Sequence, residues 1–232
     1  FSSSAAGLMQ FGVNPVGIFI DESASGKSYA EFDLSGIEVI RTAWNELQPE
    51  SLLALDPDLI VTEYWPRTQS YSGGDQMSPQ GQFSGVAPII GIEQGASILG
   101  LIEAYGELAE ALGADLDAPE IASQREAFEQ ARTELTAAAS EKPGLQVMAA
   151  YASDESLMVA APAGAAELQD FTNWGLDVVV PDAPEGEYWG ILSWENADTY
   201  PADVLLLDDR SGDDVRTAVE NQPIAEIIDA VR

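Results

Sequence analysis

The fold class is decided by residues 50–61, which read ESLLALDPDLIV. A short helix begins beside Pro49, because proline is tolerated in the first helical turn. The turn residues at 56–58 end that helix, and an apolar run follows them. A continuous apolar run bounded by turn residues is typical of a strand buried on both faces of a parallel sheet. We therefore expect a short helix that leads directly into a buried strand.

The same arrangement recurs in the second half of the chain. Glu195 stands eight residues before Asp203, as Glu50 stands eight residues before Asp58. In both halves the acidic residue opens a short helix and an apolar strand follows. A chance repeat of helix and strand does not explain the matched position of the two glutamates. The repeat indicates two related lobes.

Strand and helix patterns alternate along the rest of the chain, which predicts an α/β fold with parallel sheets. The longest helical pattern covers residues 119–141 and ends sharply at Pro143-Gly144. We expect an N-terminal lobe over 1–118 and a C-terminal lobe over 142–232. Each lobe is expected to hold a mainly parallel sheet flanked by helices, and the long rigid helix joins them.

The composition excludes several kinds of site. The 232 residues include 40 acidic and 9 basic residues, with a net charge of −31, and contain neither histidine nor cysteine. Disulfides, thiolate metal sites and a Ser-His-Asp triad therefore cannot form. So negative a field repels nucleic acid. Two explanations of the acidic surface stay open: a salty surrounding medium, or the compositional bias of the source genome.

Candidate ligand-binding residues follow the predicted strands, because ligands of open α/β sheets bind at the carboxyl ends of the strands. Aromatic side chains and a few arginines dominate these positions. Aromatic faces suit a large organic ligand, and arginine binds hydroxamate or carboxylate oxygens. The candidates are Tyr64, Trp65 and Arg67 after strand 58–62, Tyr71 in the loop 66–85, Tyr151 after strand 145–150, Tyr188 and Trp189 in the acidic loop 182–191, and Arg210 after strand 203–207.

Four segments, in this order, resemble class III periplasmic solute-binding proteins of ABC importers. These segments are residues 50–61, VAPII at 86–90, LAEALG at 108–113 and LSWE at 192–195. The resemblance implies a non-enzymatic binding protein that captures an iron–siderophore, haem or cobalamin in a cleft between its lobes. It also implies that Glu50 and Glu195 dock on the permease.

The resemblance further implies an extracytoplasmic, monomeric protein held at the membrane by lipidation. It leads us to expect a strand before Phe1 and further elements after Arg232. A chelated iron needs no protein metal ligand, so we expect neither a cofactor nor a metal site. The acidic field favours a neutral or cationic ferric hydroxamate over a polyanionic catecholate. Haem or cobalamin is the alternative ligand, and a carboxylate-based hydrolase or a divalent-metal binder is less well supported.

Overall fold

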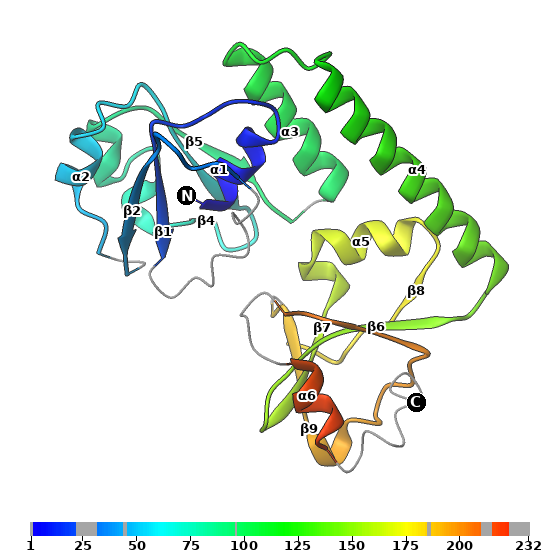
Figure 1. The fold of residues 1–232 in the computed structure, drawn as a ribbon. Coiled ribbons are helices and arrows are strands. Elements are labelled where there is room, and N and C mark those ends of the chain that lie inside the picture. Colours follow the sequence, from blue (N-terminus) through cyan, green and yellow to red (C-terminus); the bar gives the residue numbers. More distant parts are fainter. Residues whose placement is uncertain are drawn as a thin grey trace. The chain divides into compact units, whose positions relative to one another are not determined.

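The computed structural model describes residues 2–21, 32–43, 46–95, 97–184, 187–209 and 215–222. The chain divides into two compact units, Phe1–Ser123 and Gln124–Arg232, which we call the N-terminal and C-terminal units. Each unit combines β-sheet with helices (Figure 1). The predicted α/β class is therefore confirmed. The boundary falls within helix α4 (Pro119–Glu141), where the sequence predicted the longest helix.

The N-terminal unit contains a two-stranded and a three-stranded sheet. In the first, β1 and β2 are parallel; in the second, of order β4-β3-β5, strands β3 and β5 are parallel and β4 is antiparallel to β3. The elements are α1 (Ser2–Met9), β1 (Gly17–Asp21), β2 (Glu38–Thr42), α2 (Pro49–Leu53), β3 (Ile60–Trp65), β4 (Ser70–Tyr71), the 3-10 turns η2 (Asp75–Met77) and η3 (Gln82–Gly85), β5 (Ile89–Glu93) and α3 (Ile98–Ala111).

The C-terminal unit contains one mixed sheet of order β10-β6-β7-β9, with β8 paired to β6. Strands β8 and β10 are parallel to β6, whereas β7 is antiparallel to both β6 and β9. The elements are β6 (Gln146–Ala152), β7 (Ser156–Ala160), η4 (Pro162–Gly164), α5 (Ala166–Asn173), β8 (Asp177–Val178), β9 (Trp189–Ser193), η5 (Trp194–Asn196), β10 (Val204–Leu207) and α6 (Val215–Glu220).

Two helices, one in each unit, end in the same way. Gly12 follows α1 with a φ of 80°, and Gly175 follows α5 with a φ of 99°. Beyond each glycine the next amide donates back across the helix end: Val13 N to Leu8 O at 3.2 Å, and Leu176 N to Phe171 O at 3.0 Å. This is the Schellman arrangement, which requires a left-handed residue that glycine adopts without strain. A similar helix end thus leads into a strand in both halves.

Two predicted strand ends and the end of one predicted loop are wrong, and pairing with a neighbouring strand explains each. Strand β3 continues to Trp65 because β4 pairs with its last two residues. Strand β6 continues to Ala152 because β7 pairs with residues 150–152. Residues 189–193 form β9 against β7 and are not the end of a loop. Tyr64, Trp65, Tyr71, Tyr151 and Trp189 therefore lie within strands.

Candidate functional site

Strand β3 directs its side chains to two different environments. Successive side chains of a strand point to opposite faces. Ile60 packs in a cluster with Phe19 and Phe83, whereas its neighbour Val61 packs against α1 and α3 beside Tyr105. By alternation, Glu63 and Trp65 share the face of Val61. The two candidates Tyr64 and Trp65 consequently lie on opposite faces of the sheet.

Tyr64 and Tyr71 form a packed pair at the β3–β4 hairpin. Their ring centroids lie 4.9 Å apart, and Tyr71 also packs against the cluster that contains Phe83. The Tyr71 ring extends over Gly91 of β5, where a Cβ atom would come within 2.7 Å of Tyr71 Cε1. This packing gives both tyrosines a role in holding the hairpin against the sheet.

Ser72 links three side chains at the carboxyl end of β3. Its hydroxyl donates to Glu63 Oε2 at 2.6 Å, and Trp65 Nε1 donates to the Ser72 Oγ at 3.4 Å. The Ser72 carbonyl accepts from the buried Thr62 hydroxyl at 2.8 Å. The Trp65 side chain is nevertheless 40% exposed. The network therefore fixes the orientation of an indole ring that remains open to solvent.

The Glu63 carboxylate also acts on the buried Tyr105 of helix α3. Burial raises the pKa of the Tyr105 hydroxyl, and the negative charge of Glu63 raises it further, while hydrogen bonding by neighbouring side chains opposes the shift. The face of β3 that carries Trp65 therefore combines an exposed indole with a half-buried carboxylate. Arg67 lies apart from this group, exposed in the turn between β3 and β4.

In the C-terminal unit, three side chains form a row across the sheet. The strand registers pair Tyr151 of β6 with Met158 of β7, and Met158 with Ile191 of β9. The three side chains therefore share one face. Ile191 is 70% exposed and the other two are half-buried. We call these residues the Tyr151–Met158–Ile191 row.

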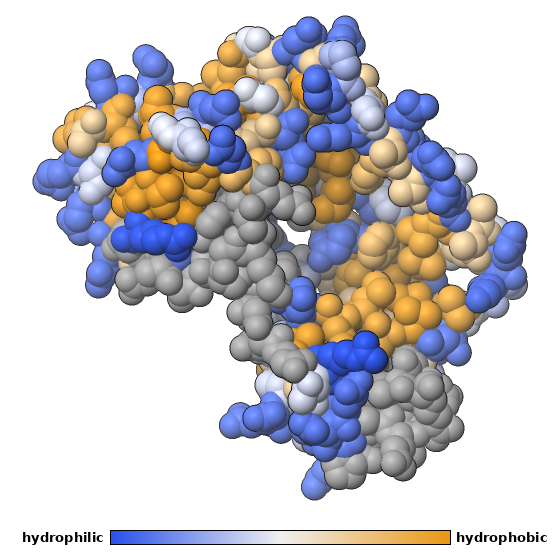
Figure 2. Space-filling model, viewed as in Figure 1, coloured by the Kyte–Doolittle hydropathy of each residue, from blue (hydrophilic) through white to orange (hydrophobic). Residues whose placement is uncertain are grey.

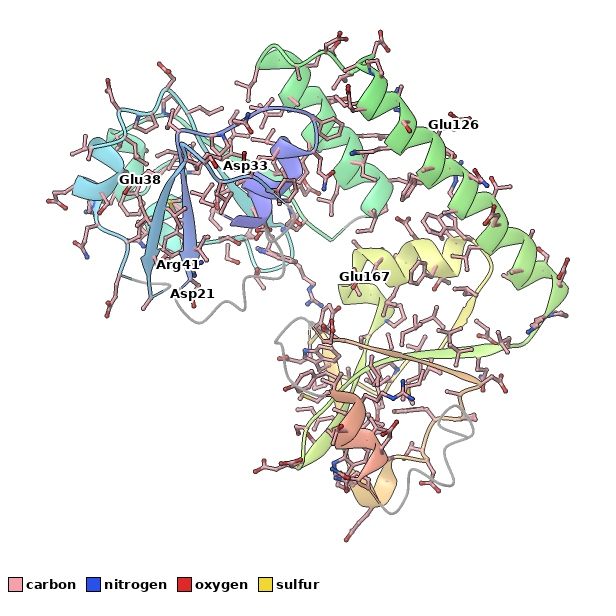
Figure 3. All side chains as sticks on the ribbon, viewed as in Figure 1. Asp21, Asp33, Glu38, Arg41, Glu126 and Glu167 are labelled. Carbon is pink, nitrogen blue, oxygen red and sulfur yellow. The ribbon has the colours of Figure 1, made fainter. Side chains whose placement is uncertain are left out.

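The neighbouring row on the same face is covered. Trp189, two residues before Ile191, packs with Ala160 and Leu168 of helix α5 in one core cluster that also includes Tyr188. The Tyr188 and Trp189 rings make an edge contact with centroids 4.6 Å apart, and the Tyr188 hydroxyl donates to Glu167 Oε1 at 3.2 Å. Glu167 lies at the first turn of α5 (Figure 3). Tyr188 and Trp189 thus border the Tyr151–Met158–Ile191 row.

Surface hydropathy agrees with this description of the C-terminal unit. Apolar residues reach the surface around α5 and β6 in the space-filling view (Figure 2).

Sequence reasoning missed Met158 and Ile191 because their position depends on strand register. The alternation in Trp189-Gly190-Ile191-Leu192 was the available signal for β9. Arg210, the remaining candidate, lies outside the described residues.

Glu50 and Glu195 occupy matched positions in the two units. Each lies exposed in the first turn of its short helix, α2 or η5. A neighbouring buried side chain anchors each helix, Leu52 in α2 and Trp194 in η5. Trp194 Nε1 also donates to the Ser153 carbonyl at 3.0 Å. The strand that follows is β3 in one case and β10 in the other. The structure therefore confirms the repeated acid–helix–strand arrangement.

The described residues, 2–21, 32–43, 46–95, 97–184, 187–209 and 215–222, contain neither a metal-binding cluster nor a membrane-spanning helix. No group of three or more Asp and Glu side chains there is arranged to hold a metal ion. No helix in the same ranges is long and apolar enough to cross a membrane.

Solved structures with similar folds include three proteins connected with siderophores. DesE, a ferric-siderophore receptor protein from Streptomyces coelicolor, is 28% identical with a TM-score of 0.85, covering 100% of this chain and 80% of its own. The siderophore periplasmic binding protein of the fuscachelin gene cluster of Thermobifida fusca is 19% identical with a TM-score of 0.68. The match covers 98% of this chain and 82% of that protein. PiaA of Streptococcus pneumoniae, in complex with ferrichrome, is 16% identical with a TM-score of 0.57, covering 99% and 77%.

The latter two likenesses show the fold alone. No curated protein matched the sequence significantly. A family model described as periplasmic binding protein matches residues 16–232, which is nearly the whole chain. The chain therefore belongs to the periplasmic binding protein family.

Proposed function

We propose that this periplasmic binding protein captures a ferric siderophore, most simply a ferric hydroxamate, and delivers it to an ABC permease. Membership of the family makes the chain a substrate-binding transport protein that acts outside the cytoplasm. The identity of the ligand, the delivery step, a monomeric state and a lipid anchor are parts of our proposal.

The observation that carries the proposal is the Tyr151–Met158–Ile191 row. An isoleucine that is 70% exposed on a sheet face, beside an aromatic ring, offers apolar surface that a bound ligand would remove from water. In the N-terminal unit, Trp65 offers an exposed aromatic ring. Apolar and aromatic surfaces of this kind suit the organic shell of a siderophore. DesE, at 28% identity, is described as a ferric-siderophore receptor, which supports this ligand class.

The amino-acid inventory also supports a chelated iron. The chain has no histidine and no cysteine, so transition-metal binding by its own side chains would depend on carboxylates, tyrosines and methionines. A siderophore already supplies a full set of oxygen ligands to its iron. The protein then needs only to recognise the organic shell and its polar atoms.

Intrinsic tryptophan fluorescence tests this proposal, because the chain contains five tryptophans. Ferric trihydroxamate, ferric tricatecholate, haem and cobalamin would each be titrated, with the iron-free chelators as controls. We expect saturable quenching by the ferric trihydroxamate and weaker quenching by the anionic tricatecholate. Saturable binding of haem or cobalamin alone would contradict the proposed ligand class.

A further inference from the structure

The Glu63 carboxylate is half-buried, and within the part of the chain that the structure describes it forms no ion pair with a lysine or arginine. The Ser72 hydroxyl donates a hydrogen bond to the Glu63 carboxylate at 2.6 Å. A partly desolvated charge is costly unless an opposite charge or several hydrogen bonds compensate it. The single hydrogen bond from Ser72 is strengthened by the negative charge, but it offsets only part of the cost of desolvating that charge. The negative charge itself therefore needs another explanation.

An exposed aromatic ring lies next to this carboxylate. Trp65 is two residues from Glu63 on the same strand face, and Ser72 is hydrogen-bonded to both side chains. The indole N–H donates to Ser72, so the ring face is the part of Trp65 that remains available to a ligand. The side chain is 40% exposed. A carboxylate and an aromatic face together form a suitable binding site for an ammonium group, which gains both a charge-assisted hydrogen bond and a cation–π contact.

The chemistry of iron chelates shows where such a group would come from. Three hydroxamate anions neutralise one iron(III), so the net charge of a ferric trihydroxamate is that of its terminal substituents. A terminal primary amine gives the complex a positive charge near neutral pH. The protein, with a net charge of −31, attracts such a complex and repels an anionic one.

Resting on the proposed function, we infer that the ligand is a ferric hydroxamate with a terminal protonated amine, and that Glu63 and Trp65 bind this amine. Glu63 is then a specificity-determining residue: it discriminates among chelates with the same iron centre by their terminal charge. Ser72 acts as a positioning residue that holds the carboxylate and the indole at a fixed separation.

Calorimetric titration with two matched probes tests this inference. The first probe is the iron(III) complex of a linear trihydroxamate that ends in a primary amine, and the second is the same complex after acetylation of that amine. We expect the intact protein to bind the first probe about tenfold more tightly, as for one partly buried charged contact. In Glu63→Gln this preference should fall to about twofold or less, while affinity for the acetylated probe stays unchanged.

Two further variants make the result specific. Glu38→Gln removes the same charge from an exposed side chain at the first residue of β2 and should keep the tenfold preference. Trp65→Leu should reduce the preference without removing the carboxylate. Thermal unfolding of each variant would show that it is folded, and added salt should decrease the preference more in the intact protein than in Glu63→Gln.

The possible failures are distinguishable. If neither probe binds, the proposed function is wrong. If both probes bind equally well to the intact protein, the ligand class of the proposed function survives and the amine inference is overturned. The assignment to Glu63 is also overturned if Glu63→Gln keeps the preference, or if Glu167→Gln, in the C-terminal unit, removes it instead.

Discussion

The Tyr71 ring occupies the space above Gly91 into which any other residue would place its Cβ atom. That atom would lie 2.7 Å from Tyr71 Cε1. Gly91 is paired with Thr62 in the middle of β5, so the backbone there cannot easily move away. The absence of a side chain at this position allows the β3–β4 hairpin to pack on the sheet.

We therefore expect Gly91→Ala to lower the free energy of unfolding by about 1–3 kcal/mol, as is usual when an extra carbon is forced into a packed site. Urea unfolding would measure the change. Gly85→Ala is the matched control, because a Cβ atom there meets no atom within 4 Å. Because the hairpin also carries Trp65, affinity for the ferric trihydroxamate should fall in Gly91→Ala as well. Equal stability of the two variants would contradict the role given to Tyr71.

A second prediction concerns the Tyr151–Met158–Ile191 row. Ile191→Ser should change the free energy of unfolding by no more than about 0.5 kcal/mol, because the side chain is 70% exposed. Affinity for the ferric trihydroxamate should nevertheless fall by roughly ten- to a hundredfold, the value of one apolar side chain buried against a ligand. Fluorescence titration would measure it.

The control for Ile191 lies in the same sheet. Leu206 of β10 is also an exposed apolar residue, and Leu206→Ser should leave ligand affinity unchanged. If both variants weaken binding equally, the loss reflects a general effect on the sheet. If neither does, the row is not part of the ligand site.

The sequence predicted those features of the fold that depend on local pattern. The buried strand β3 and the helix before it followed from residues 50–61. Helix α4 matched its predicted range at both ends.

What the sequence did not predict depends on pairing between distant segments. Tyr151 and Ile191 are forty residues apart in the chain, and Met158 brings them into one row through two antiparallel registers. A strand pattern indicates which side chains share a face but not which strand lies beside it. Sequence reasoning accordingly named side chains that lie on β3, β6 and β9, and it missed Ser72 and Ile191.

The buried hydroxyl of Tyr105 gives a prediction about pH. Its pKa in the folded protein is raised above the ordinary value near 10, mainly by burial. The folded protein then holds this proton more tightly than the unfolded chain does. Its contribution to stability is complete below pH 10 and is lost as the pH rises through the folded pKa. Tyr105→Phe should therefore show a smaller loss of unfolding free energy between pH 8 and pH 11 than the unaltered protein.

The other six tyrosines and the two lysines contribute a background to that measurement, because they titrate near the same pH. Tyr200→Phe provides the comparison, although it removes the hydrogen bond from the Asp182 amide to the Tyr200 hydroxyl. Both variants lose one hydrogen-bonding hydroxyl, so only the dependence on pH separates them. A pH dependence of Tyr105→Phe identical to that of the unaltered protein would show that Glu63 and burial do not hold the proton on Tyr105.

The last prediction separates delivery from capture. Glu50 and Glu195 are exposed, and each begins a short helix anchored by a buried side chain, so reversing their charges should leave the fold intact. Loss of a carboxylate from the first turn of a helix costs about 0.3–1 kcal/mol. The double variant Glu50→Arg/Glu195→Arg should bind the ferric trihydroxamate with unchanged affinity and fail to support uptake of radioactive iron in cells. Each single reversal should reduce uptake partially, because one docking contact remains.

The matched control for docking reverses exposed acids elsewhere. Glu38→Arg/Glu126→Arg makes the same change in net charge on β2 and α4, and uptake should persist (Figure 3). If this pair also abolishes uptake, the permease responds to the total charge of the protein and not to the two helix starts. If Glu50→Arg/Glu195→Arg supports normal uptake, the repeated acid–helix–strand arrangement records only the relatedness of the two units, because charge repulsion at two docking points could not leave transport unaffected.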